Sequence, residues 1–344
     1  MSTQRVALWD NARFGAIALM VAGHALTKMV GENDAAFTLY VFIYAFHVPV
    51  FVAVSGYFTK GTAPDDRRIR SVFTDILVPY VIFELIWSVV YFLYNGNYRL
   101  DLTRASWTLW FLLALAVWRI LLPYLVALKY PLLISIVISI EAGYFPIDQT
   151  FSAARVLGFL PFFVFGWQLR EWNLGERWMA LCSQSVLRWR ILAVGFMAVV
   201  AVFIALNVPL LRELQIRSFI TYDSGFATFG YDQWWAGLGR LAAMMVAAAM
   251  IMAFLILIPR EKTWFTQFGQ ATMYVYLLHT FVLFPLREYG VLDGERPLWY
   301  ILLVLVGAVG LTVLLSTPLI VRIFKPLVQP SMSWLFVTPR DSHR

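Results

Sequence analysis

The sequence predicts an all-α fold, a polytopic transmembrane helical bundle of about ten spans. Of its 344 residues, 61% are hydrophobic and only 14% are charged, whereas soluble domains carry roughly 25% charged residues. Apolar runs of about 17–25 residues, long enough to cross a bilayer as a helix, recur from one end of the chain to the other. The connections between these runs are short, and none has the length of a separate soluble domain.

The expected spans follow one another through almost the whole chain. Their approximate bounds are 12–30, 37–58, 72–94, 107–126, 130–146, 151–169, 189–208, 234–258, 268–286 and 298–321. We expect residues 1–325 to form one transmembrane domain and residues 326–344 to form a short cytoplasmic tail, without a fused soluble domain. Cytoplasmic loops are enriched in Lys and Arg, and roughly twice as many of them fall on the N-terminal side as on the other. Both termini are therefore predicted to be cytoplasmic, in agreement with an even number of spans.

The formal net charge of +7 does not indicate a nucleic-acid partner. The basic residues are scattered over short loops and do not form a patch that could follow phosphates. Membrane lipids are the expected surroundings instead. Cys182 is the only cysteine, which excludes an intramolecular disulfide and a cysteine metal cluster.

Three of the four histidines fall at a similar depth on three different predicted spans. From the helical rise of 1.5 Å per residue, His24, His47 and His279 each lie roughly 15 Å into their spans. One such imidazole can simply be hydrogen-bonded to a neighbouring helix as part of the packing. Ionisable groups inside a bilayer are costly and mark functional paths, so three at one depth indicate that at least one is functional.

Zinc is a weaker interpretation of the same histidines. Three imidazoles and a water can form a catalytic zinc site. No two of these histidines are three or four residues apart, however, and no carboxylate pattern accompanies them. We therefore predict no metal site.

The second span and the loop after it carry two local signals. Pro49 removes a backbone hydrogen bond one turn earlier and is expected to kink the helix beside His47. The loop segment DDRRIRS brings Arg67, Arg68 and Arg70 together. The preference of cytoplasmic loops for basic residues explains these arginines; the alternative is a phosphate site, because guanidinium groups bind phosphates bidentately.

Three further charged residues, Glu84, Arg119 and Arg240, lie within predicted spans. Ionisable side chains in such positions face the protein interior or a water-filled path. Ion pairing within the protein is the default expectation for all three.

Several motifs resemble those of the membrane acyltransferase 3 family. The run Asp10-Asn11-Ala12-Arg13 followed by VAGH, which ends at His24, is similar to the opening motif of that family. The segment FHVPVFVAVSGYF, residues 46–58, resembles its second span. The looser similarities are the arginines before VPY at 78–80, LWFL at 109–112, LPFFVFG at 160–166 and MYVYLLHTF at 273–281. Together they cover most of the chain.

The resemblance implies an O-acyltransferase of a bacterial-type cytoplasmic (inner) membrane. Members of the family move an acyl group from cytoplasmic acyl-CoA to a hydroxyl of a cell-envelope glycan or glycolipid. The donor expected first is acetyl-CoA, with succinyl and other short acyl groups as alternatives. The resemblance further implies that His24 is catalytic and that Asp10 and Arg13 are required beside it. The residues it implies for the CoA phosphates are Arg67, Arg68 and Arg70.

The expected chemistry needs a base for the attacking hydroxyl and donors for the developing oxyanion. We expect His24 to be that base, with a covalent acyl-histidine as the alternative. Asp10 and His24 are about 21 Å apart along a continuous helix, so they cannot form a direct dyad unless the helix breaks near Gly15. Asp10 is expected to pair with Arg13, and His47 is the nearer candidate partner for His24.

A transporter or flippase is the competing class, because buried ionisable residues also mark substrate paths. An inverted repeat would favour it, and the hydropathy shows none. Soluble acyltransferases have a histidine followed four residues later by an aspartate, and this pattern is absent after His24, His47 and His279. An acyltransferase here must therefore be of an integral-membrane type. The residues expected along a possible substrate channel are Trp110, Tyr276, His279, Glu84 and Arg240.

Overall fold

A computed structural model describes residues 6–96, 98 and 100–332 of the chain. These residues fold into α-helices joined by short loops, brief turns of 3-10 helix and one π-helical segment, Phe73–Leu77, and the described part contains no strand. The predicted all-α class is confirmed. The expected tail falls largely on residues 333–344, which lie outside the described part.

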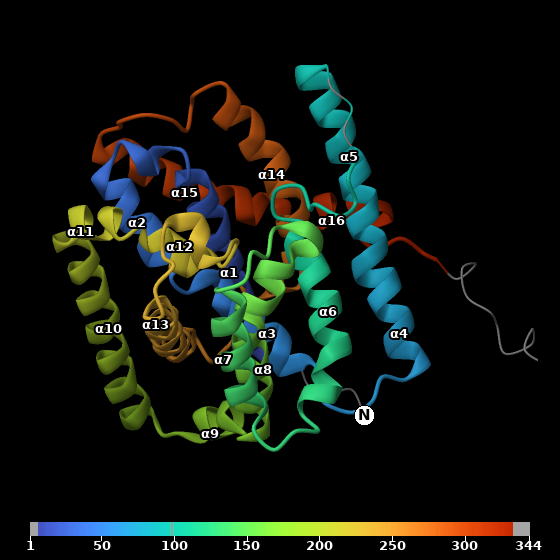
Figure 1. Ribbon diagram of the computed structural model, residues 1–344. Helices are drawn as coiled ribbons and strands as arrows, with labels where there is room; N and C mark the ends of the chain where they lie inside the picture. Colours follow the sequence, from blue (N-terminus) through green and yellow to red (C-terminus); the bar gives the residue numbers. More distant parts are fainter. Residues whose placement is uncertain (1–5, 97, 99, 333–344) are drawn as a thin grey trace, which may run out of the picture.

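The α-helices succeed one another with few long connections (Figure 1). In chain order they are α1 (Ala7–Leu26), α2 (Asp34–Tyr44), α3 (His47–Phe58), α4 (Asp66–Val72), α5 (Val78–Asn95), α6 (Trp110–Leu125), α7 (Pro131–Ala142), α8 (Ala153–Glu171), α9 (Leu174–Ala180), α10 (Ser183–Leu206), α11 (Val208–Glu213), α12 (Ile216–Thr221), α13 (Ala236–Leu257), α14 (Thr272–Glu288), α15 (Leu298–Leu315) and α16 (Pro318–Val328).

A helix lies at each of the ten predicted spans, but fewer meet a strict length and hydropathy criterion. Six helical segments of the described chain are long and apolar enough to cross a membrane. They are Asp34–Phe58, Asp66–Asn95, Thr150–Glu171, Ser183–Leu206, Ala236–Leu257 and Leu298–Leu315. The chain is therefore a membrane protein with six candidate spans, while the count of ten and the orientation of the termini stay predictions.

The second predicted span is broken in its middle, as Pro49 led us to expect. Helix α2 ends at Tyr44 and α3 begins at His47. Pro49 lies in the first turn of α3, where its missing N–H needs no helical acceptor. At the break, the carbonyl of Ile43 accepts a hydrogen bond of 3.2 Å from the backbone N–H of Phe46 and a second one of 2.9 Å from Nδ1 of His47. The kink thus fixes the orientation of one of the three histidines.

Helices α3 and α8 pack backbone against backbone through two glycines. A Cβ atom on Gly56 would lie 1.9 Å from the carbonyl oxygen of Phe163, and one on Gly166 would lie 1.8 Å from that of Ala53. No side chain can be accommodated at such distances. Small residues allow helices to approach closely in membranes, and here they bring α3 and α8 together beside the centre of the bundle.

Helix α1 runs through the centre of the molecule, between α10 on one flank and α4–α5 on the other (Figure 1). It packs against α2, α3, α14 and α15 and against the 3-10 turn Thr266–Gln270. In Figure 1 the ribbon of α15 runs across the view, behind α1. This central position explains why α1 is mostly buried, including its polar residues Asp10 and Asn11.

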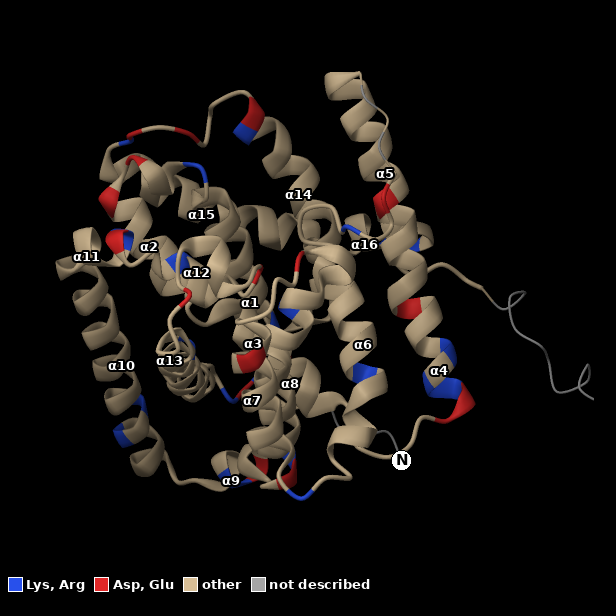
Figure 2. Ribbon diagram, viewed as in Figure 1, with Lys and Arg blue, Asp and Glu red and all other residues tan. Residues whose placement is uncertain are grey.

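Charged side chains concentrate toward the two ends of the bundle. We call the end where α1 begins the N-terminal side and the opposite end the far side. On the N-terminal side, basic residues gather on α4, on α9 and at the beginning of α10 (Figure 2). The predicted cytoplasmic location of that side rests on these same Lys and Arg residues and stays a prediction.

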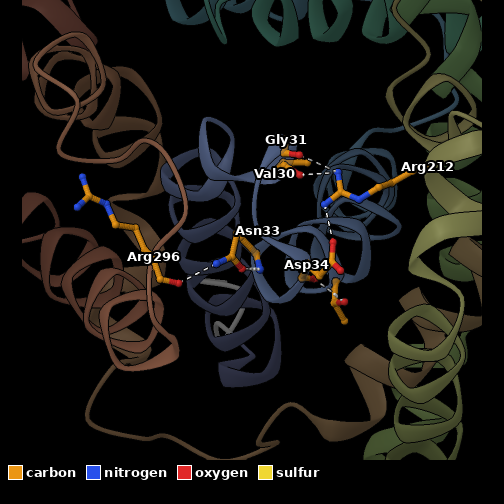
Figure 3. Close-up of polar contacts among 8 residues, drawn as sticks. Val30, Gly31, Asn33, Asp34, Arg212 and Arg296 are labelled. Atoms are coloured by element: carbon orange, nitrogen blue, oxygen red, sulfur yellow. Dashed lines mark hydrogen bonds and ion pairs between the residues drawn. The ribbon is translucent and has the colours of Figure 1, made fainter.

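On the far side, hydrogen bonds and an ion pair connect the α1–α2 connection to neighbouring segments (Figure 3). Arg212 of α11 donates to the carbonyl oxygens of Val30 and Gly31 and forms an ion pair of 2.9 Å with Asp34. Asn33 caps α2 by accepting from the backbone N–H of Ala36, and its amide donates to the carbonyl of Arg296. Three segments distant in sequence are thereby held together next to the end of α1.

Candidate active site

The fold brings the three histidines together from α1, α3 and α14. Nδ1 of His24 lies 2.9 Å from Nε2 of His279, and the two rings are stacked with centroids 5.2 Å apart. The ring of His47 is 6.2 Å from that of His24 and nearly perpendicular to it. The partner that hydrogen-bonds His24 is thus His279, and His47 is a neighbour.

The hydrogen bonds define the tautomers of His279 and His24. Nδ1 of His279 lies 2.9 Å from the carbonyl oxygen of Val275, which can only accept. A neutral His279 therefore carries its proton on Nδ1 and presents an unprotonated Nε2. His24 must then donate from its own Nδ1, which leaves the lone pair of its Nε2 available to accept a proton from a third group.

His47 differs from the other two histidines in its surroundings. It is fully buried, its Nδ1 donates to Ile43, and its Nε2 has no hydrogen-bond partner among the described residues. It does not line the cavity that reaches His24. Within the described chain, no three His, Cys, Asp or Glu side chains are arranged as metal ligands.

A cavity of about 220 Å³ leads to His24 between α1, α3, α6 and α14. It follows α1 from Arg13 to His24, a distance of about 16 Å for eleven helical residues. Its walls are mostly apolar and include Phe51, Phe58 and Leu115. The cavity therefore has Arg13 and His24 on one lining, about 16 Å apart, with a mostly apolar wall around them.

Two guanidinium groups line this cavity, those of Arg13 and Arg119. Arg13 forms the predicted ion pair with Asp10, 3.3 Å long, and its guanidinium lies 4.5 Å from the ring centroid of Phe58. Arg119 makes no hydrogen bond and no ion pair with any residue that the structure describes. Its positive charge is available to a ligand in the cavity.

The Asp10–Arg13 end of α1 is anchored by the segment that follows α13. Asn11 is fully buried, and its amide nitrogen donates to the carbonyls of Pro259 and Glu261, both at 2.9 Å. Its amide oxygen accepts from the hydroxyls of Thr263 and Thr266. Asp10 and His24 lie on one continuous helix, which confirms that they do not form a dyad.

The arginines predicted for phosphate binding lie away from this cavity. Arg67 and Arg70 are exposed on α4. Arg68 is used locally, because its guanidinium donates to the carbonyls of Lys60 and Thr62 and to the Thr62 hydroxyl. None of the three lines the cavity that contains His24.

A family comparison decides what kind of protein carries this site. The model of an acyltransferase domain, acyltransferase 3, matches residues 6–317 and so covers most of the chain. The chain belongs to the membrane acyltransferase 3 family. Its central α1 and the cavity along it lie within the matched region, so the acyltransferase site is to be sought there.

Other comparisons of this acyltransferase are more limited. Over 115 residues it is 31% identical to nodulation protein NolL of Sinorhizobium fredii (strain NBRC 101917 / NGR234). That match covers 28% of this chain and 31% of the relative, so it is a local similarity. No solved structure shows a significant match.

The looser sequence motifs of the acyltransferase contribute residues to the wall of the cavity. Trp110 and Tyr276 both line it, and the Tyr276 hydroxyl donates to the carbonyl of Thr108. Trp110 stacks on Phe159 and lies under the guanidinium of Arg155, 5.0 Å from it. These two predicted channel residues thus line the same cavity as His24.

Glu84 and Arg240 have other surroundings. Glu84 accepts from the backbone N–H of Ser106 at 2.6 Å and so fixes the loop before α6. Arg240 donates to the carbonyl of Ser139 and is enclosed by the rings of Tyr222 and Phe226. Neither forms an ion pair within the described residues, nor does Arg119, so the expectation of internal ion pairing was wrong for all three.

Two residues of the site were missed or left without a role by the sequence. Arg119 stands out only as a charge within an apolar helix, and its position on the cavity depends on the rotation of α6. Asn11 belongs to the opening motif, but its partners are some 250 residues away in sequence. Only the tertiary structure identifies them.

Proposed function

We propose that this chain is an integral-membrane O-acyltransferase that moves an acetyl or other short acyl group from acyl-CoA to a hydroxyl of a cell-envelope glycan or glycolipid. The observation that carries the proposal is the hydrogen bond from His24 to His279. It leaves Nε2 of His24 unprotonated at the inner end of a cavity whose other end is basic.

In this mechanism His24 is the general base. Its Nε2 takes the proton of the acceptor hydroxyl while the oxygen attacks the thioester carbonyl. The tetrahedral intermediate collapses with breakage of the C–S bond, and the leaving sulfur takes the proton back from His24. The products are an ester and free CoA thiol, and the imidazole returns to its starting tautomer.

The charge and lining of the cavity suit an acyl donor that has an anionic end and a long, narrow arm. Arg13 and Arg119 would hold a phosphate of CoA on the N-terminal side, which we place in the cytoplasm of a bacterial-type inner membrane. The pantetheine arm would occupy the apolar passage and bring the thioester to His24, about 16 Å farther along α1. The acceptor would reach His24 from the far side.

The experiment is acyl transfer by the purified protein in lipid vesicles, with radiolabelled acetyl-CoA and an envelope glycolipid extract. We expect labelled acceptor and stoichiometric CoA thiol from the wild type, and at least a hundred-fold loss in His24→Ala, in line with general-base contributions of about 10²–10⁴. Asn207→Ala, at the exposed end of α10, is the matched control and should be fully active. Equal label transfer by His24→Ala contradicts the role of His24.

The same experiment separates base catalysis from a covalent acyl-histidine, and it tests whether the chain transfers acyl groups at all. Label that stays on the denatured protein when acceptor is omitted identifies an acyl-histidine instead of base catalysis. If the wild type releases no CoA thiol with any acceptor, the proposed O-acyl transfer is wrong.

A further inference from the structure

Three arginines converge on the far side of His24, opposite the end at which the donor would enter. They are Arg155 of α8, Arg217 of α12 and Arg287 of α14. All three interact electrostatically with Tyr44, whose ring centroid is 6.2 Å from that of His24. Helices distant in sequence therefore direct positive charge toward one location next to the candidate base.

Ring contacts fix the position of each guanidinium. Arg155 lies over Trp110, which lines the cavity of His24. Arg217 lies 5.6 Å from the ring centroid of Tyr40, and Tyr40 stacks on Tyr44 with centroids 3.9 Å apart.

Arg287 lies over Trp107 at 4.5 Å. It follows His279 by eight residues, about 12 Å along α14. Each of the three guanidinium groups is thus held over an aromatic ring.

The charge of this cluster is only partly compensated. Arg155 forms an ion pair of 3.4 Å with Asp223. Arg217 and Arg287 form no ion pair with the residues that the structure describes. Glu288 follows Arg287, but its carboxylate accepts from the exposed hydroxyl of Tyr94. A positive excess remains beside a membrane-embedded site, where unpaired charge is costly.

Two donors of the cluster also lack partners. The hydroxyl of Tyr40, a residue only 1% exposed, and Nε of Arg287 are buried without a hydrogen bond in the described structure. Buried polar groups are nearly always hydrogen-bonded. Unsatisfied donors together with unpaired guanidinium groups are what an anion-binding site shows when its ligand is absent.

We propose that Arg155, Arg217 and Arg287, with Tyr40 and Tyr44, bind an anionic group of the acyl acceptor, a phosphate or a carboxylate. Guanidinium groups bind both bidentately. The ring spacing of 6.2 Å between Tyr44 and His24 places this group about one sugar ring from the reacting hydroxyl. The acceptor is then an acidic glycan or a glycosyl phosphate. The inference rests on the proposed function, because it takes the ligand of this cluster to be the acyl acceptor.

Binding of three matched probes tests this site without catalysis. The probes are dodecyl glucoside, dodecyl glucuronide and dodecyl-phosphoryl-glucose, titrated calorimetrically into the protein in phosphatidylcholine nanodiscs. We expect at least one anionic probe to bind ten-fold or more tightly than the neutral glucoside. A preference for the glucuronide identifies an acidic sugar, and a preference for the phosphate identifies a glycosyl phosphate.

Variants assign the preference to the cluster. In Arg217→Gln and Arg287→Gln we expect the affinity for the anionic probe to fall about ten-fold, as for the loss of one charge-assisted contact, with no change for the glucoside. Arg217→Lys should retain part of the preference. Arg104→Gln removes an exposed arginine that pairs with Asp148, and it should bind like the wild type.

Two results would overturn the proposal. One is equal binding of all three probes by the wild type, which needs no variant to fold. The other is an unchanged anion preference in the Arg217→Gln/Arg287→Gln double variant. His24→Ala should keep the full preference while losing acyl transfer, so a failure of the proposed function and a failure of the anion site give different results.

Discussion

Nδ1 of His24 donates a hydrogen bond of 2.9 Å to Nε2 of His279. His279 in turn is held by the carbonyl of Val275, one helical turn earlier on α14. The proton positions along this series of hydrogen bonds are determined by the Val275 carbonyl, which can only accept. A backbone carbonyl thereby does for His24 what a carboxylate does in a Ser-His-Asp triad: it fixes the tautomer and the orientation of the base, but adds no negative charge within the membrane.

The first prediction concerns His279 as a positioning residue. His279→Ala removes the acceptor for His24 Nδ1, so the imidazole can rotate and change tautomer. We expect kcat for acyl transfer to fall by about a hundred-fold, the scale of a misplaced catalytic group, while KM for acetyl-CoA stays within two-fold. His279→Gln, whose side-chain oxygen can accept, should recover part of kcat. A KM increase with unchanged kcat would place His279 in donor binding instead.

The second prediction distinguishes His47 from the other two histidines. His47→Asn places an amide N–H where Nδ1 donates to Ile43, at the break between α2 and α3. We expect activity within about ten-fold of the wild type, because Nε2 of His47 is buried and His47 does not line the cavity that contains His24. His47→Leu loses the hydrogen bond and should lower the thermal unfolding midpoint. A loss in His47→Asn as large as in His24→Ala would make His47 a direct participant.

The third prediction concerns the donor. Arg119→Gln removes the one cavity guanidinium without an ion pair in the described structure, and we expect KM for acetyl-CoA to rise about ten-fold, in line with one charge-assisted contact. Arg67→Gln, on exposed α4, is the matched control and should change KM less than two-fold at physiological ionic strength. A large KM effect in Arg67→Gln with none in Arg119→Gln would move the phosphate site to α4.

The sequence predicts depth along a helix well and rotation about it poorly. Counting residues placed three histidines at one level, and it excluded a dyad between Asp10 and His24, because rise per residue is nearly constant. It could not tell which imidazole would bond His24. That choice depends on how α14 turns toward α1, which is set by packing between segments some 250 residues apart.

The contrast between position along a helix and rotation about it also explains which contacts of the charged residues could be predicted. The Asp10–Arg13 pair is local, one helical turn long, and was predicted from spacing. Arg119 and Arg240 were assigned ion pairs by default, but the structure gives one a cavity wall and the other an aromatic enclosure. Partners of that kind come from other helices, so composition alone does not reveal them.

The fourth prediction tests the anchor of α1. Asn11 is fully buried, and Asn11→Ala leaves the part-buried carbonyls of Pro259 and Glu261 without their donor. We expect a loss of about 2–3 kcal/mol of stability, since each unsatisfied buried group costs about 1–3 kcal/mol. Denaturant unfolding of the reconstituted protein measures it. Asn207→Ala removes an exposed hydrogen bond to Phe203. Its free energy of unfolding should stay within about 0.5 kcal/mol of the wild type, as is usual for surface substitutions.

The fifth prediction concerns the contact between α3 and α8 that positions the wall beside His24. Gly166→Ala would place Cβ 1.8 Å from the carbonyl oxygen of Ala53, so the two backbones must separate. We expect a destabilisation of about 1–3 kcal/mol, typical of overpacking, and a fall in kcat because α3 carries one side of the cavity.

The matched control is Gly195→Ala on α10, where a Cβ meets nothing within 4 Å. It should be neutral or stabilising by up to about 1 kcal/mol, since alanine favours helix over glycine. If Gly166→Ala behaved like Gly195→Ala in both unfolding and activity, the close approach of α3 to α8 would not hold the site together.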